Sequence, residues 1–168
     1  KLMGQPLVEC YQLLAPGGSV ETFCNTHRAF QAEHLYLAIP FEHTESTLRE
    51  VQGRGIKMAV ATSRSRQNSI RTLELAGIRD YFEVVVSLED VSRHKPFPDA
   101  ILKALGQMGI EPCNSVMVGD MNEDILAGKN ADVRTVAATY GFQGVSLALN
   151  RPDYLINDIQ ELVPVVLK

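Results

Sequence analysis

The chain has 168 residues, of which 45% are hydrophobic and 21% are charged, and its formal net charge is −4 at pH 7. This length and composition are typical of one folded domain with a small appendage, and no apolar run is long enough to cross a bilayer. The basic residues are spread along the chain rather than clustered, so we expect neither a nucleic-acid partner nor a membrane partner.

Residues 1–40 are predicted to be helical. A first helix is expected to end at Leu14, before the helix-breaking run Pro16-Gly17-Gly18. Ser19 is in position to cap a second helix, whose apolar stripe would contain Phe23, Phe30 and Leu37. No strand pattern occurs in this part of the chain.

After Pro40 the pattern alternates between helices and strands. Helices are expected at 44–52, 65–76, 98–108, 124–131 and 159–167. Strands are expected at 56–61, 82–86, 115–118, 134–138 and 154–156. This alternation predicts βαβ crossovers and a mainly parallel sheet. The continuous apolar strands predict that helices cover both faces of that sheet.

Two carboxylates follow the expected strand 115–118. Asp120 comes directly after Gly119, and Asp124 lies four residues further on. Ligands bind at the carboxyl ends of parallel strands, and two close acids favour a divalent cation with oxygen ligands, Mg²⁺ being the default. The alternative is a solvated acidic loop that begins a helix, with Asn122 and Glu123 as its first residues.

Thr62 and Ser63 follow the expected strand 56–61 and precede a helix. A hydroxyl group together with backbone N–H groups at a helix N-terminus can bind a phosphoryl oxygen. The alternative is an ordinary helix cap. Ser65 is better placed for capping, which leaves Thr62 available for another task.

Lys95 lies in a loop that Pro96 and Pro98 stiffen. A lysine held in this way loses less conformational entropy in a site than a surface lysine does, and it could neutralise a phosphate or a carboxylate. His94 could act as a base, although a partly exposed loop histidine is the simpler interpretation. Asp99 is expected to cap or begin the following helix.

Taken in order, these residues resemble the second, third and fourth motifs of the haloacid dehalogenase-like hydrolase superfamily. The run that ends in Thr62-Ser63 is similar to the second motif, Lys95-Pro96-Phe97-Pro98-Asp99 to the third, and Gly119-Asp120 through Asp124 to the fourth. The chain is most similar to the phosphoglycolate phosphatase and pyrophosphatase subgroup. The resemblance implies an α/β fold: a Rossmann-like, mainly parallel core at 41–168 that lacks its first strand, and a partial helical cap at 1–40.

The resemblance also implies an activity. It implies a Mg²⁺-dependent phosphatase that hydrolyses a small phosphorylated metabolite, such as phosphoglycolate, through an aspartyl-phosphate intermediate. Asp120 would ligate Mg²⁺, and Asp124 would hold a metal-bound water or complete the metal's shell. Thr62, helped by the N–H of Ser63, would bind the phosphoryl group, and Lys95 would stabilise the charge of the nucleophile and of that group.

The sequence departs from the family at the first motif, Asp-x-Asp after an apolar strand. No two aspartates of the chain are separated by a single residue. The resemblance places the nucleophile and the acid/base in that motif, so we expect this chain alone to be inactive. A missing central strand would also leave unpaired backbone groups in the sheet. We therefore expect the chain to be the downstream part of a longer protein, with the motif within about 50 residues upstream.

Two alternative functions stay open. The first is a noncatalytic phosphate- or metal-binding module that regulates a partner, which the missing nucleophile favours. The second is a haloacid dehalogenase, whose chemistry needs no metal and therefore no Asp120.

The cysteines lack the spacing of a metal or redox site, which indicates reduced thiols in a cytoplasmic protein, at Cys10, Cys24 and Cys113. We expect a monomer or a homodimer. The specific substrate stays open, because in this family it depends largely on the cap. The polar candidates there, for which surface exposure is the simpler interpretation, are Gln5, His27, Arg28, His34 and His43.

Overall fold

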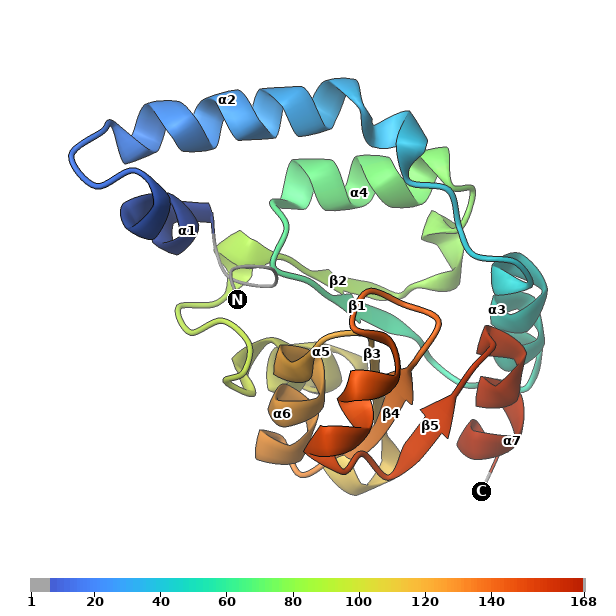
Figure 1. The fold of residues 1–168 in the computed structure, drawn as a ribbon. Coiled ribbons are helices and arrows are strands. Elements are labelled where there is room, and N and C mark those ends of the chain that lie inside the picture. The colour runs from blue at the N-terminus through green and yellow to red at the C-terminus, as the bar shows by residue number, and fades with distance from the viewer. Residues whose placement is uncertain (1–6, 168) are drawn as a thin grey trace.

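The computed structural model describes residues 7–167 (Figure 1). Its helices are α1 (Leu7–Leu14), α2 (Val20–Glu33), α3 (Thr44–Gly53), α4 (Arg66–Leu75), α5 (Asp99–Met108), α6 (Asn122–Asn130) and α7 (Leu162–Val166). Its strands are β1 (Ala59–Ala61), β2 (Val84–Val86), β3 (Val116–Gly119), β4 (Arg134–Ala138) and β5 (Tyr154–Ile156). Each predicted helix and strand is therefore present. No helix within 7–167 is both long and apolar enough to span a membrane.

The N-terminal helices form where the sequence predicts them. Ser19 caps α2, because its hydroxyl accepts the backbone N–H of Thr22 at 3.3 Å. The predicted apolar stripe is wrong: Phe30 and Leu37 are 62% and 65% exposed, and Cys24 is the buried residue of α2. The stripe assumed one helix that continues through Leu37, but α2 ends at Glu33 and the chain turns into a short 3₁₀ helix, η1 (Leu35–Leu37).

The strands form two parallel sheets rather than one. β1 pairs with β2, and β4 pairs with both β3 and β5. Within residues 7–167 no strand pairing joins β1 to β3, and Figure 1 shows the two groups one above the other. The fold is the predicted α/β type with parallel strands, and its sheet is interrupted between β1 and β3.

Helices cover both faces of the three-stranded sheet. Met117 of β3 packs on one face, in a cluster with Ile101 and Leu105 of α5 and Ala127 of α6. Its neighbours in β3 point to the opposite face, because side chains alternate along a strand. There they pack with buried residues of β4, β5 and α7: Val136, Ala138, Ile156 and Val165.

Helix α5 also contacts the two-stranded sheet. Ala100 and Ala104 pack with Val86 of β2 and with the alanines of β1, whereas Ile101 and Leu105 belong to the cluster with α6. The pairs lie on adjacent stripes of the helix, since each pair is separated by four residues. One helix therefore contributes to the cores of both sheets.

Candidate functional site

The carboxyl end of β3 holds the two predicted acids in a tight turn. Oδ2 of Asp124 accepts the backbone N–H groups of Asp120 at 3.2 Å and of Met121 at 3.1 Å. Gly119 permits this close approach, because a Cβ at that position would lie 2.2 Å from Cβ of Asp124. Packing thus explains the glycine at position 119, because it leaves room for the Asp124 carboxylate over the end of the strand.

Lys95 links the acids to the other sheet. Its Nζ donates to Oδ1 of Asp124 at 2.6 Å and to the backbone carbonyl of Ala61, the last residue of β1, at 3.2 Å. The side chains of Lys95 and Asp124 are only 13% and 8% exposed. The carbonyl of Ala61 therefore bonds to an ammonium group rather than to a strand, and this bond brings the second, third and fourth predicted motifs together.

The loop that carries Lys95 is held on both sides. Asn130 of α6 donates from Nδ2 to the carbonyl of Pro96 at 2.8 Å. Arg93 donates to Asp99 at 3.0 Å, and Asp99 begins α5, as predicted. His94 is half-buried, and its ring makes no hydrogen bond with any residue in the described range. These contacts hold the backbone on both sides of Lys95.

Thr62 lies at the carboxyl end of β1, where the sequence predicts it. Its backbone N–H donates to Val86 of β2 at 2.9 Å, and its Oγ1 accepts the N–H of Arg64 at 3.2 Å. Ser63 is half-buried in the same turn. The pair follows the same strand end as the Ala61 carbonyl that Lys95 contacts.

The predicted helix cap at Ser65 is only half right. Ser65 is the N-cap residue of α4, but its side chain makes no capping hydrogen bond. Glu89, in the 3₁₀ helix η3 (Leu88–Asp90), accepts the N–H of Arg66 at 2.9 Å instead. Its neighbour Asp90 pairs with the Arg66 guanidinium, which holds the pKa of Asp90 below its ordinary value. A carboxylate is favoured at a helix N-terminus by the helix dipole, so Glu89 replaces the serine there.

The two acids differ in what they could offer a metal ion. Both oxygens of Asp124 are engaged, by Lys95 and by the backbone N–H groups. Asp120 uses Oδ2 to accept the N–H of Phe142 at 2.9 Å, and Oδ1 has no partner among residues 7–167. Mg²⁺ is usually held by one or two carboxylates, with waters and substrate phosphates completing its shell. Asp120 fits that role, and Asp124 as it stands does not provide a free oxygen.

The described residues alone do not complete a metal site. Nowhere in 7–167 do three or more His, Cys, Asp or Glu side chains gather closely enough to hold a metal ion. Asn122 and Glu123 begin α6, as the alternative interpretation expected, and Oε2 of Glu123 is buried without a hydrogen-bond partner. A Mg²⁺ ion at Asp120 would need further oxygen ligands from water, from substrate or from another segment.

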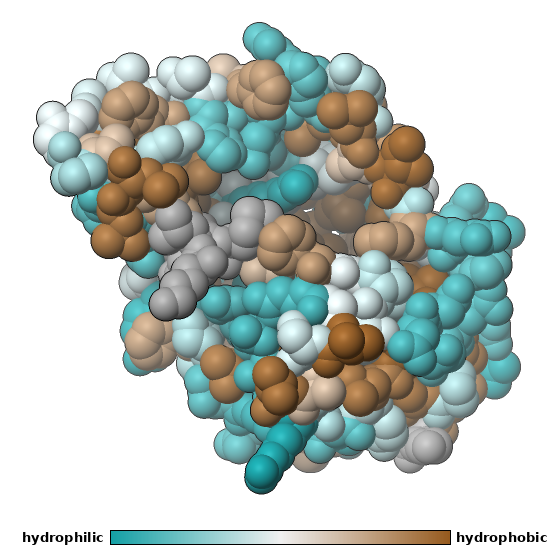
Figure 2. Space-filling model, in the orientation of Figure 1, coloured by the Kyte–Doolittle hydropathy of each residue, from teal (hydrophilic) through white to brown (hydrophobic). Residues whose placement is uncertain are grey.

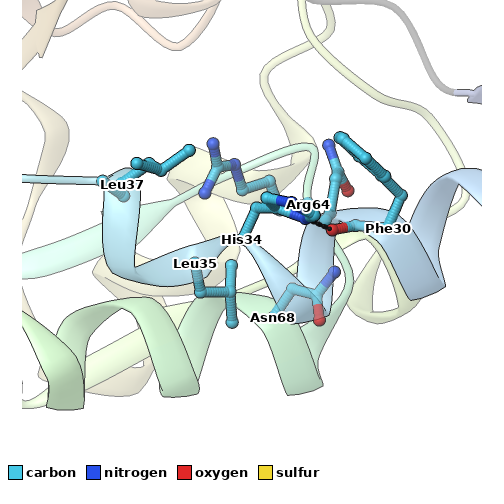
Figure 3. Close-up of a pocket in the computed structure, with 8 residues that line it drawn as sticks. Phe30, His34, Leu35, Leu37, Arg64 and Asn68 are labelled. Atoms are coloured by element: carbon cyan, nitrogen blue, oxygen red, sulfur yellow. Dashed lines mark hydrogen bonds between the residues drawn. The ribbon is translucent and has the colours of Figure 1, made fainter.

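A cavity of about 280 Å³ lies between the end of α2 with η1 and the start of α4 (Figure 3). Apolar side chains of Phe30, Leu35 and Leu37 line it together with Arg64, which directly follows Ser63. The Arg64 guanidinium donates to Thr72 at 3.4 Å and forms no salt bridge with any described residue. The cavity could therefore bind an anionic group that carries an apolar body.

The polar candidates from the first forty-three residues have structural partners. His27 shares a hydrogen bond with Tyr11 at 3.0 Å. His34 donates from Nδ1 to the carbonyl of Phe30 at 2.8 Å and lines the cavity. Arg28 lines a neighbouring cavity beside Ser65, and His43 bonds to Asp158 at 3.0 Å. Gln5 lies outside the described residues.

Sequence reasoning missed the segment that follows β4. Besides the Phe142 contact, the backbone N–H of Gln143 donates to the carbonyl of Asp120 at 3.2 Å. Tyr140-Gly141-Phe142 begins two residues after β4, the strand that neighbours β3. Its place at the carboxyl edge could have been inferred from the strand order expected of a parallel sheet.

Comparison with known proteins identifies the family. The model for haloacid dehalogenase-like hydrolases matches residues 1–138. Over 165 residues the chain is 32% identical to the pyrophosphatase PpaX of Halalkalibacterium halodurans, and the match covers 98% of this chain and 77% of the relative. A haloacid dehalogenase-like hydrolase from Bacteroides fragilis shares the fold with a TM-score of 0.87 and 23% identity, covering 96% of this chain and 80% of that one.

A second solved structure, a predicted phosphoglycolate phosphatase from Haemophilus somnus 129pt, has a TM-score of 0.80 and 22% identity, and the match covers 94% of this chain and 73% of that one. The sequence match extends over most of the chain and includes all three motifs that Lys95 brings together. The chain therefore belongs to the haloacid dehalogenase-like hydrolases.

Proposed function

We propose that the protein is a Mg²⁺-dependent phosphatase that hydrolyses a small phosphorylated metabolite through an aspartyl-phosphate intermediate. The family and the named phosphatase and pyrophosphatase relatives support a phosphatase. Phosphoglycolate and pyrophosphate are the first substrates to test, because the relatives are named for them.

One observation carries the proposal: the ammonium of Lys95 bonds both to Asp124 beyond β3 and to the last carbonyl of β1. The Lys95 ammonium places a positively charged donor between two strand ends, paired with Asp124, where Thr62 and Asp120 also lie. Such a place suits a phosphoryl group and an attacking carboxylate, since both are anionic.

The residues of this chain would act mainly by positioning and charge. Thr62 and the N–H of Ser63 would bind oxygens of the phosphoryl group, and Lys95 would stabilise the charge that develops during transfer. Mg²⁺, when bound at Asp120, would offset the repulsion between the phosphate and the nucleophile. Asp124 would hold Lys95 in place and keep the turn after β3 closed.

We propose further that the nucleophile belongs to a segment upstream of this sequence. The interruption between β1 and β3 supports this, because one parallel strand placed there would join the two sheets and lie between Thr62 and Asp120. A strand ending at that edge would bring an Asp-x-Asp pair beside Lys95. The 168-residue chain alone would then be inactive. We call this sequence together with that segment the complete protein.

The central test is Asp120→Asn in the complete protein. We expect Mg²⁺-dependent hydrolysis of an aryl phosphate to fall about a thousandfold or more, because the amide keeps the shape but loses the charge. The acceptor for Phe142 is retained, so the free energy of unfolding should change by less than about 1 kcal/mol. Steady-state rates with and without Mg²⁺, followed by a screen of metabolite phosphates, measure the effect.

Asp132→Asn is the matched control. Asp132 is exposed and has a φ of 56°, a conformation that asparagine tolerates well. This variant should keep full activity. If Asp120→Asn hydrolyses the ester as fast as the Asp132 variant does, the assignment of Asp120 to magnesium is wrong.

A noncatalytic phosphate-binding module is the second candidate function. The absence of any Asp-x-Asp pair from this sequence favours it. The two proposals differ in one measurement: a binding module would bind phosphate with Lys95 and Thr62 intact, but the complete protein would not turn over any phosphate ester with Mg²⁺.

A further inference from the structure

The segment that follows β4 hydrogen-bonds both the side chain and the backbone of Asp120, the proposed metal-binding residue. The backbone N–H of Phe142 donates to Oδ2 of Asp120 at 2.9 Å, and the N–H of Gln143 donates to the carbonyl of the same residue at 3.2 Å. Oε1 of Gln143 also accepts the N–H of Asn122 at 2.7 Å. Three hydrogen bonds thus join residues 140–143, which we name the 140–143 loop, to the turn after β3.

The 140–143 loop approaches Asp120 so closely that residue 141 has no room for a side chain. A Cβ built on Gly141 would lie 2.2 Å from Cβ and 2.6 Å from Oδ2 of Asp120. Approaches below 3.0 Å do not occur between real Cβ atoms, so any other residue at 141 would have to move the loop or the carboxylate. The φ of Gly141 is not positive. Glycine is therefore needed at position 141 because of the limited space and not because of the backbone conformation.

We propose that the 140–143 loop is a positioning element for Asp120. By occupying Oδ2 with the N–H of Phe142, the loop fixes the rotation of the carboxylate and leaves Oδ1 as the oxygen available to a divalent cation. A free aspartate would rotate between several rotamers, and holding one of them removes that entropy cost from metal binding. The inference rests on the proposed function in taking Mg²⁺ as the cation and in using the complete protein for the test.

The loop is itself anchored to the segment that leads away from the N-terminal helices. The rings of Phe41 and Tyr140 pack edge to face, with centroids 5.0 Å apart. Tyr140 also packs against the buried cluster of β4, β5 and α7. The loop is thus supported by the core on one side and contacts Asp120 on the other, as a positioning element requires.

The test is Gly141→Ala in the complete protein, with Mg²⁺ affinity measured by isothermal titration calorimetry in the absence of substrate. We expect the dissociation constant to rise at least about tenfold, because the new methyl group must displace the Asp120 carboxylate. Gln143→Met replaces the side-chain amide at similar volume, removes the Oε1 acceptor for Asn122 and should raise the dissociation constant about threefold. If Gly141→Ala fails to fold, the Gln143 variant decides.

Two alanine substitutions at other glycines separate positioning from stability. Gly106 in α5 faces open space, so Gly106→Ala should leave Mg²⁺ affinity unchanged and should not destabilise the helix. A Cβ on Gly128 would meet Thr135 at 2.7 Å and Met117 at 3.0 Å in the core. Gly128→Ala should therefore lower the unfolding midpoint without changing Mg²⁺ affinity.

Each outcome decides one of the two proposals. A folded Gly141→Ala protein that binds Mg²⁺ like the wild type overturns the positioning role, and so does an equal loss of affinity in Gly128→Ala. A wild-type protein that binds no Mg²⁺ also overturns it. A wild type that binds Mg²⁺ but hydrolyses no phosphate ester contradicts the proposed function, whereas the positioning role of the loop would stand on the binding data.

Discussion

The strands beside the interruption of the sheet differ from those one position further out. Every residue of β1 and β3 is only half-buried, whereas β2 has two buried residues and β4 has four. In an uninterrupted open sheet the central strands are covered on both faces and are the most buried. The reversed order here agrees with the proposed upstream strand, which would pair with the free sides of β1 and β3. Three predictions test that comparison.

The largest effect is expected at Lys95, the residue that bonds across the interruption. Lys95→Ala should lower the free energy of unfolding by about 3 kcal/mol, because it leaves the nearly buried carboxylate of Asp124 without its cation. In the complete protein, turnover should fall by about a hundredfold or more, since a charge at the phosphoryl group is lost. Urea denaturation and steady-state kinetics measure the two effects.

Lys57 is the matched control for this experiment. It lies just before β1 at the opposite end of the strand, is 45% exposed, and donates to the carbonyl of Met108 at 3.1 Å. Lys57→Ala should cost less than about 0.5 kcal/mol and should not affect turnover. Equal losses of stability in the two variants would show that the bond across the interruption has no special importance.

A pair of valines tests the comparison directly. Val136 of β4 is fully buried, so Val136→Ala should destabilise the protein by about 2 kcal/mol. Val60 of β1 is half-buried, and Val60→Ala should cost only about 1 kcal/mol in the 168-residue chain. In the complete protein, an added strand should raise the cost at Val60 to that at Val136. If the cost at Val60 is the same with and without the upstream segment, no strand enters beside β1.

The smallest effect is expected at Tyr140, which lies just after the buried strand β4. Burial, followed by the charges of Asp158 and Asp120, raises the pKa of Tyr140 to about 12. A group whose pKa is higher in the folded state stabilises the fold below its unfolded pKa, about 10 for tyrosine, and this contribution is lost as pH rises toward 12. Tyr140→Phe should therefore flatten the loss of stability between these two pH values.

Denaturation curves recorded across that alkaline range, with tyrosinate absorbance as a second signal, measure this effect. Tyr36→Phe is a suitable control, because Tyr36 is 65% exposed. An identical alkaline decline in the Tyr140 variant and the wild type would mean that Tyr140 is not shielded from water.

The sequence predicted the bounds of β4 and β5 better than those of β1. The strands 134–138 and 154–156 match β4 and β5 to the residue, because each apolar run is bounded by polar or turn-forming residues. The strand expected at 56–61 is only Ala59–Ala61, since β1 has one partner and its ladder extends only as far as β2 does. Pairing decides where a strand ends, and pairing is not visible in a local pattern.

The candidate site divides in a similar way. That Thr62, Lys95 and the acids meet at the carboxyl edge followed from motif order and parallel topology. Motif order and topology did not predict that both oxygens of Asp124 are already bonded, or that Glu89 caps α4. The bonds of Lys95 to Asp124 and of Glu89 to Arg66 join residues more than twenty positions apart in the chain. The bonds to Oδ2 of Asp124 are local, but they depend on a side-chain direction that only the folded structure fixes.

The position of helix α5 in both cores has a consequence for how the protein unfolds. Since its Ala100 and Ala104 belong to the core of one sheet and its Ile101 and Leu105 to that of the other, neither sheet can open without exposing part of the same helix. The amides of α5 should therefore exchange with solvent in the same step as those of β2 and β4. One ten-residue helix makes the two halves a single cooperative unit.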